Sequence, residues 1–173
     1  MSQNANWLSA EDWKWVQDHM PIPCADVVPV RLDSTGQLEK IGLIFRDTPH
    51  QGRRWCMVGG RMWRNESLAD ASVRQLHETL GPQVRFDIDP DRQPDFVVQY
   101  FTTERVIGFV DPRQHAITLA IMVPITGIII PTGEAADFRW FDPDQLPPPS
   151  EWGFGQDRAV GKCLEAWMRD RRE

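Results

Sequence analysis

Long apolar runs, an excess of basic residues and a secretory leader are all missing from this sequence. No stretch approaches the roughly 18 apolar residues that a membrane-spanning helix requires, and the start, "MSQNANWLSAEDW", has neither the basic nor the apolar region of a signal peptide. Lys and Arg number 19 against 25 Asp and Glu, and the net charge of −6 argues against general affinity for nucleic acid or anionic membranes. We therefore expect a cytoplasmic protein with no nucleic-acid or membrane partner, which would hold any phosphate ligand with local arginines or a metal.

Cysteine is also scarce. The three cysteines, Cys24, Cys56 and Cys163, are odd in number, lie far apart and have no metal-binding spacing. This arrangement predicts reduced thiols in the core rather than disulfides or a cysteine metal site.

The composition that remains is that of one globular domain. Hydrophobic residues make up 41% and charged residues 25%, and no repeat or linker divides residues 1–173. Apolar periodicity and turn residues predict helices at 8–20, 67–80 and 156–172. They predict strands at 25–32, 41–46, 55–58, 61–63, 96–103, 116–125 and 136–141, with Pro29 hinting at an edge or bulge and 82–95 irregular. The expected fold class is α/β, with a mixed sheet between helices.

One stretch carries the strongest chemical signal. "GGRMWRNESLADASVRQLHETLG" (59–81) reads as a strand end, a glycine turn and a helix. Residues three and four apart share a helix face, so Arg74, Gln75, Glu78 and Thr79 point broadly the same way. Since Mg²⁺ is often bound by one or two carboxylates, Glu78 is a candidate ligand and Arg74 its charge partner. From spacing alone, an ordinary solvated salt-bridge face explains these residues at least as well.

The same stretch resembles a Nudix box, whose pattern is G-x5-E-x7-R-E-U-x-E-E-x-G-U. The matching positions are Gly60, Glu66, Arg74, Leu76, Glu78 and Gly81, and the departures are Gln75, Thr79 and Pro82. A wider match covers about residues 21–142, in which "PHQGRRWCMVGGR" resembles the GDP-mannose mannosyl hydrolase branch and "FRWF" matches the motif that closes the Nudix sheet. The resemblance implies a Nudix-type α/β/α sandwich, with 59–82 as its box loop and helix. It also implies hydrolysis of a nucleoside diphosphate linked to another moiety, most specifically a GDP-mannose-like nucleotide sugar.

The resemblance further implies a reduced metal site. Most Nudix enzymes hold their metal with glutamates at the positions of Gln75, Glu78 and Thr79 and with the backbone carbonyl that here belongs to Gly59. The mannosyl hydrolase branch adds a side chain from a loop, and the matching position, six residues before Trp140, is Glu134. The expected ligands of Mg²⁺, or of Mn²⁺ in its place, are therefore Gly59, Glu78 and Glu134, although Glu134 reads equally well as a solvated loop acid. Glu66 is expected to be structural.

Substrate contacts and the general base follow from the same comparison. Arg46 and Arg61 match arginines that contact the leaving diphosphate, and Asp26 matches an acid near the sugar. Taken alone, they are also ordinary strand-end residues. The histidine base of the mannosyl hydrolase branch is replaced here by Ala135, so we consider His115, which would join Arg61, Arg74 and Glu78 in the catalytic set. A structural histidine is the competing interpretation of His115.

Two functional hypotheses therefore remain, together with one about association. Glu134, Arg46 and Arg61 favour a hydrolase, whereas Gln75 and Thr79 favour a catalytically lapsed Nudix domain that binds a nucleotide or a protein partner. The tryptophan-rich segment "NWLSAEDWKW", within a predicted helical extension at 1–20, is too apolar for a free tail. Because the mannosyl hydrolase branch is dimeric, we expect a homodimer that buries part of this extension.

Overall fold

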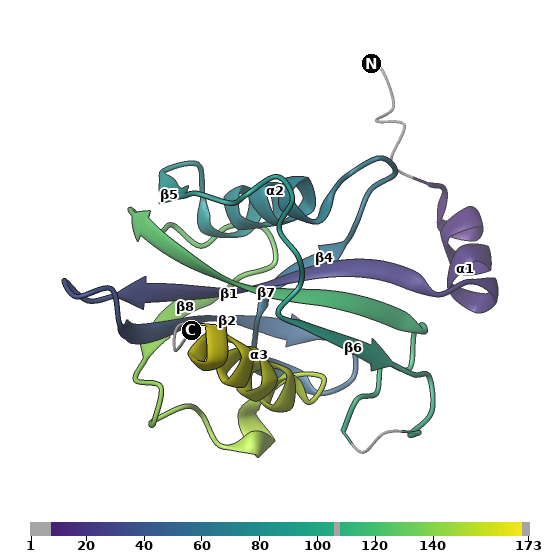
Figure 1. Cartoon of the computed structure of the whole chain (residues 1–173). Helices are drawn as coiled ribbons and strands as arrows, with labels where there is room; N and C mark the ends of the chain where they lie inside the picture. Colours follow the sequence, from purple (N-terminus) through teal and green to yellow (C-terminus); the bar gives the residue numbers. More distant parts are fainter. Residues whose placement is uncertain (1–7, 106–107, 171–173) are drawn as a thin grey trace.

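A single sheet of eight strands forms the centre of the molecule. The computed structural model describes residues 8–105 and 108–170. The strands run β3-β2-β1-β7-β5, with β4 also paired to β1, β6 to β7 and β8 to β2. Helices α2 and α3 lie on opposite sides of this sheet (Figure 1), so the predicted α/β/α sandwich is confirmed.

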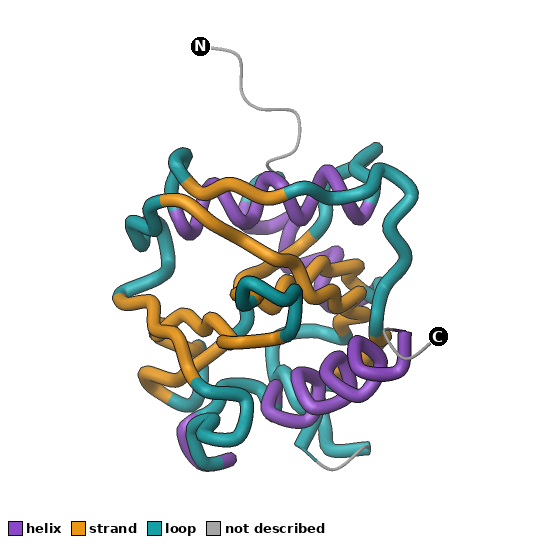
Figure 2. Tube along the Cα trace, turned by 60° about the vertical axis from the view of Figure 1, so that its left-hand side comes forward, coloured by secondary structure: helices purple, strands orange, loops and turns teal. Residues whose placement is uncertain are grey.

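The strands are β1 (Ile22–Leu32), β2 (Leu38–Thr48), β3 (Gly52–Cys56), β4 (Val58–Arg61), β5 (Val84–Phe86), β6 (Phe96–Tyr100), β7 (Ala116–Gly127) and β8 (Asp137–Phe141). The helices are α1 (Ala10–His19), α2 (Leu68–Leu80) and α3 (Gln156–Asp170), with a short 3₁₀ turn at Pro149–Glu151. Figure 2 shows α2 and α3 separated by the strands.

Strand β1 lies in the middle of the sheet. It runs parallel to β7 along nearly its whole length and antiparallel to β4 and then β2 on its other side. Burial on both faces explains its nearly continuous apolar sequence. Pro29 was expected to mark a sheet edge or a bulge, but it lies inside the sheet, paired with Val123 of β7, and the register shift of β1 falls between Arg31 and Leu32. Pro29 lies where the antiparallel neighbour changes from β4, opposite Val27, to β2, opposite Val30, so its missing N–H falls at a break in that pairing.

Local signals explain helix α2. Ser67 caps its first turn by accepting the Asp70 N–H, while the Asp70 carboxylate accepts the Ser67 N–H, which completes a capping box. Gly81 ends the helix with φ of 90°, a conformation that favours glycine. Leu76 and Leu80 are fully buried where α2 packs on β4 and β1.

Two strand predictions differ from the structure. Residues 82–95 were expected to be irregular, but Val84–Phe86 form β5 against the end of β7. The strand expected at 61–63 is found instead at Val58–Arg61. Its pairing with β1 starts at Val58, includes Gly59 and Gly60, and stops at Arg61. In both cases the pairing partner is distant in the chain, and a short strand has little propensity of its own.

Helix α1 packs loosely at one end of the sheet (Figure 1). Ser9 caps it as predicted, but none of its residues is fully buried. On its inner side Trp13 and Val16 pack against the core, Arg61 lies over the Trp13 ring, and the Gln17 amide donates to Gln114. Within the described ranges, no helix combines the length and apolarity needed to cross a membrane. All three cysteines are buried and free, as expected.

Candidate active site

A cleft of about 230 Å³ opens beside β4, on the face of β1 that carries Asp26. Its lining comes from distant parts of the chain: α1, β1, β2, β4, the loop before β8 and the start of α3. Five of the predicted site residues line it: Asp26, Arg46, Gly59, Arg61 and Glu134. Arg74, Glu78 and His115 do not.

The glycine pair lets two polar side chains approach β4 closely. A Cβ atom on Gly59 would lie 2.1 Å from Asp26 Oδ1, and one on Gly60 would lie 3.0 Å from Gln75 Nε2. Because successive residues of a strand point to opposite faces, the Asp26 carboxyl covers one face of β4 and the Gln75 amide the other. Any side chain at Gly59 would displace Asp26 from the cleft.

Asp26 is a buried acid of the cleft, with only 7% of its surface exposed. Burial and, less strongly, the nearby Glu134 charge raise its pKa to about 7, with Arg46 opposing both. Gln156 donates a long hydrogen bond of 3.4 Å to Asp26 Oδ2. The sequence comparison placed Asp26 near the sugar of a substrate. The structure makes it a buried carboxyl whose charge is costly unless a ligand or a cation compensates it.

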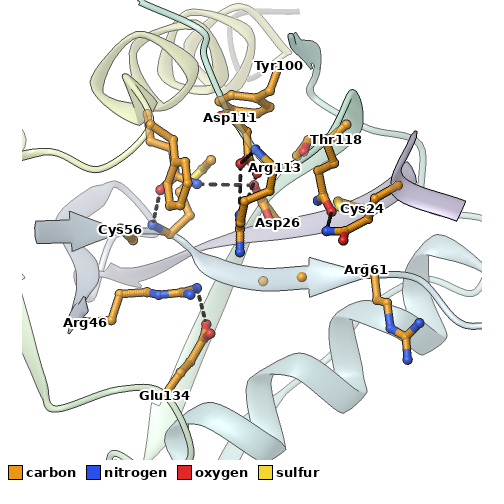
Figure 3. Close-up of a pocket in the computed structure, with 18 of the residues that line it drawn as sticks. Cys24, Asp26, Arg46, Cys56, Arg61, Tyr100, Asp111, Arg113, Thr118 and Glu134 are labelled. Atoms are coloured by element: carbon orange, nitrogen blue, oxygen red, sulfur yellow. Dashed lines mark hydrogen bonds and ion pairs between the residues drawn. The ribbon is translucent and has the colours of Figure 1, made fainter. Parts of the chain in front are cut away.

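Arg46 and Glu134 form an ion pair across the cleft, at 2.7 Å between Nη1 and Oε1. Figure 3 shows the two side chains pointing toward one another from β2 and from the loop before β8. Burial raises the pKa of Glu134, while Arg46 lowers it. A diphosphate could bind Arg46 in place of Glu134, which would release the Glu134 carboxylate for a cation.

Arg61 lies apart from this pair (Figure 3). Its guanidinium carbon is 4.6 Å from the centre of the Trp13 ring, in a cation–π contact between β4 and α1. Arg61 therefore lies at the end of the cleft nearest α1. Arg46 and Arg113 are the other arginines that line the cleft.

Glu66 and Arg74 shape the loop between β4 and α2. Arg74 donates to both carboxylate oxygens of Glu66, at 2.6 and 2.8 Å, and to the Arg61 carbonyl at 3.1 Å. Glu66 also accepts the Trp63 N–H at 2.7 Å. These bonds agree with the structural role expected for Glu66. They also direct Arg74 to the loop backbone, away from the cleft lining.

The helix positions that usually bind metal are only partly available. Gln75 and Thr79 are buried against the body, whereas the Glu78 side chain is 54% exposed and pairs with Arg74 at 3.2 Å. The Glu78 carbonyl accepts the Thr132 hydroxyl at 2.6 Å, which holds the loop of Glu134 close to the end of α2.

No group of three or more His, Cys, Asp or Glu side chains in the described part of the chain could hold a metal ion. The carboxylates of Glu78 and Glu134 and the Gly59 carbonyl fit Mg²⁺ only if water and substrate phosphate supply the remaining oxygens. This is a common arrangement for Mg²⁺.

His115 does not reach the cleft, contrary to the prediction. It hydrogen-bonds Gln99 at 3.3 Å and stacks on Phe101 at 4.8 Å. Ala116 and Thr118 line the cleft, and the alternation of strand side chains turns their odd-numbered neighbours to the opposite face. This geometry favours the structural interpretation of His115.

The cleft also contains residues that the sequence did not single out. Arg113 forms a two-pronged ion pair with buried Asp111, at 2.9 and 2.8 Å. Tyr100, from β6, and Gln156, at the start of α3, close its inner end. "DPRQ" could have drawn attention to Asp111 and Arg113 as a charged turn before a strand, but nothing local marks Tyr100 or Gln156.

Comparison with known proteins agrees with this geometry. The model of a family described as "Domain of unknown function (DUF4916)" matches residues 3–153. A solved structure described as possible asymmetric diadenosine tetraphosphate (Ap(4)A) hydrolases from Jonesia denitrificans is 32% identical, with a TM-score of 0.79 over 86% of this chain and 95% of that one. No curated protein matches the sequence.

More distant structures share the fold. A MutT/nudix family protein from Enterococcus faecalis is 18% identical, with a TM-score of 0.60 over 92% of this chain and 74% of that one. An ADP-ribose pyrophosphatase from Streptococcus suis is 20% identical, with a TM-score of 0.54 over 85% and 92%. The family match, the box and the shared fold lead to one conclusion: the chain belongs to the DUF4916 family, within the Nudix superfamily.

Proposed function

We propose that this protein is a divalent-metal-dependent hydrolase of a nucleoside diphosphate linked to a second group. The observation that carries the proposal is the cleft, which brings Arg46, Arg61, Glu134 and the Gly59–Gly60 backbone together around buried Asp26. Arginines that neutralise a departing diphosphate and carboxylates that orient water are the parts such a reaction needs. The superfamily and the 32% identical structure support this class of substrate.

Different residues of the protein would bind the diphosphate, orient the water and hold the metal. Arg46 and Arg61 would bind the diphosphate and stabilise the negative charge that grows on it as the bond breaks. Glu134 would orient the attacking water. The Gly59 carbonyl, Glu78 and Glu134 would hold Mg²⁺ or Mn²⁺, which when bound supplies positive charge to the phosphates and lowers the pKa of a bound water.

A nucleotide sugar of the GDP-mannose type is the first substrate candidate, because "PHQGRRWCMVGGR" resembles that branch of the superfamily. A dinucleoside polyphosphate is the second, since the 32% identical structure is described as a possible Ap(4)A hydrolase. Both contain a phosphoanhydride that the two arginines could flank.

A catalytically lapsed domain that binds nucleotide or protein is the competing function. The replacement of two box glutamates by Gln75 and Thr79 favours it, as do the arginine partners of Glu78 and Glu134. This alternative predicts nucleotide binding without turnover.

A hydrolysis screen over nucleoside diphosphate sugars and dinucleoside polyphosphates, with Mg²⁺, Mn²⁺ or EDTA, tests the proposal. We expect metal-dependent turnover that falls at least tenfold in Glu134→Gln, with Glu165→Gln, at an exposed pair on α3, as the matched control. Binding of substrate with no turnover under any metal would establish the lapsed alternative instead.

Metal titration by calorimetry tests the ligand assignment separately. We expect Glu78→Gln to weaken Mg²⁺ or Mn²⁺ binding in the presence of a nucleoside diphosphate, because the site loses one of its two carboxylates. Equal metal affinity in wild type and variant would remove Glu78 from the site.

A further inference from the structure

The inner end of the cleft contains a polar atom that the protein itself leaves without a partner. The Tyr100 hydroxyl is buried and lines the cleft; the Gln156 side chain lies beside it, but no side chain of the described residues meets it in good hydrogen-bond geometry. Among those residues it is the one buried side-chain nitrogen or oxygen in this state. Such a group is costly to leave unsatisfied, and a ligand that bonds to it would remove that cost.

The Asp26 carboxyl is the neighbouring group with hydrogen-bonding capacity to spare. It is 7% exposed, and its contact with Gln156 Nε2 is long, at 3.4 Å. The Gln156 oxygen is already used, since it accepts the Met57 N–H at 2.9 Å. The Asp26 charge lies close enough to Tyr100 to add to the effect of burial in raising the pKa of its hydroxyl. Tyr100 and Asp26 therefore form one adjacent pair.

The other polar side chains near this end are engaged with one another. Asp111 is held by Arg113, and Gln114 by Gln17 at 2.9 Å. The remaining lining is largely apolar or aromatic: Cys24, Cys56, Met57, Ala116 and Phe154. Two available polar groups within apolar walls suit a ligand that has flat apolar faces and one hydrogen-bonding edge.

We propose that Tyr100 and Asp26 form a subsite that binds the hydrogen-bonding edge of a nucleobase, with the attached diphosphate directed toward Gly59 and Arg46. This inference rests on the proposed function and specifies which part of the substrate enters the inner cleft. A base presents donors and acceptors along an edge and apolar faces above and below, and proteins bind it by edge hydrogen bonds between apolar or aromatic side chains. A sugar presents hydroxyls on several sides and would need more available polar partners than this pair. The assignment therefore differs from the sugar contact that the sequence comparison implied for Asp26.

Tyr100→Phe tests the subsite, because it removes the hydroxyl and retains the ring. With Mg²⁺ present, calorimetry would compare ADP, GDP, CDP and UDP with inorganic pyrophosphate and glucose 1-phosphate. We expect wild type to prefer at least one nucleoside diphosphate over pyrophosphate. Tyr100→Phe should weaken that ligand about fivefold to tenfold, the size of one hydrogen bond, and leave pyrophosphate binding unchanged.

The matched control is Ser72→Ala, which removes a buried hydroxyl on α2 outside the cleft lining. Thermal unfolding would show that Tyr100→Phe is folded, with a Tm equal to or above that of wild type because an unsatisfied hydroxyl is gone. Ser72→Ala should bind every probe as wild type does.

Three results would overturn the subsite: unchanged binding of all probes by Tyr100→Phe, an equal loss for nucleoside diphosphates and pyrophosphate, or a loss confined to glucose 1-phosphate. The first would mean that water satisfies the hydroxyl, the second that it contacts phosphate, and the third that the sugar binds there. Wild type that binds none of the probes would overturn both the subsite and the proposed function. Binding that depends on Tyr100 but is accompanied by no turnover would retain the subsite and reject the enzyme.

Discussion

Arg61 is the residue whose role best separates a hydrolase from a binding domain. It lines the cleft at the α1 end and packs on Trp13. In an enzyme, its charge would act mainly on negative charge that develops as the diphosphate leaves. In a binding domain, it would contribute only to ground-state affinity.

We expect Arg61→Ala to lower kcat by about 10²–10³-fold if the protein is a hydrolase, the usual effect of losing one preorganised stabilising donor. For a pure binding domain, the same change should only weaken nucleotide affinity, by about 1.5–3 kcal/mol. Paired kinetics and calorimetry would decide, with Arg53→Ala, at an exposed pair with Asp47, as control. Turnover undiminished by Arg61→Ala would remove this arginine from the mechanism.

The cysteines give a second prediction at the residue scale. Burial raises the pKa of Cys24, Cys56 and Cys163 to about 12. Since the thiolate is the reactive form, a raised pKa keeps these thiols inert at every pH well below 12. Alkylation by iodoacetamide should therefore stay slow between pH 7 and 9 in the native protein and rise with pH once it is unfolded. Mass spectrometry that finds rapid native modification at pH 8 would contradict this.

At the scale of elements, the loop from β4 to α2 is held by a nearly buried ion pair. The side chains of Glu66 and Arg74 are each 14% exposed, and they link the loop backbone at Trp63 and Arg61 to the helix. The Glu66–Arg74 pair thus fixes the loop against the helix through contacts that do not involve Gln75 or Thr79.

Replacing Glu66 should therefore cost stability. Glu66→Gln would leave Arg74 with exposed Glu78 as its remaining carboxylate partner, and we expect a loss of about 2–3 kcal/mol in the free energy of unfolding. Glu165→Gln removes an exposed carboxylate that pairs with Lys162, and should change stability by less than about 0.5 kcal/mol. Urea titrations of both variants would measure the difference; equal effects would show that the loop does not depend on this pair.

At the scale of the whole molecule, helix α1 packs less closely on the sheet than helices α2 and α3 do. Leu8, Trp15 and Met20 are 45, 56 and 53% exposed in or beside it. The predicted dimer would cover part of residues 1–20; residues 1–7 lie outside the described residues. An apolar helix face with little packing of its own is a common contact between identical chains.

Light scattering should give a mass near twice 20.0 kDa. Trp15→Glu should shift it toward the single-chain mass, because a charge in an apolar interface is costly. Ile128→Glu, at an equally exposed apolar position outside α1, should not. A mass of one chain across a wide concentration range would reject the homodimer.

Most of the fold could be predicted from the sequence because its signals are local. Ser67 and Gly81 bound helix α2 through contacts within one turn, and the apolar run of β1 marks a strand buried on both faces. The resemblance to the Nudix box likewise implied the loop and helix at 59–82. Short β5, the bounds of β4 and the central place of Pro29 were missed, since all three depend on partners distant in the chain.

The sequence by itself determined the superfamily, the glycine pair and the charges available for phosphate. Tertiary structure alone decided which of them meet. It paired Arg46 with Glu134, turned His115 to the opposite face, and buried Asp26 beside Tyr100. The physical reason is separation along the chain: Gln156 reaches Asp26 across 130 residues and Met57 across 99. No local pattern encodes contacts of that range, because they arise only when α3 packs on the assembled sheet.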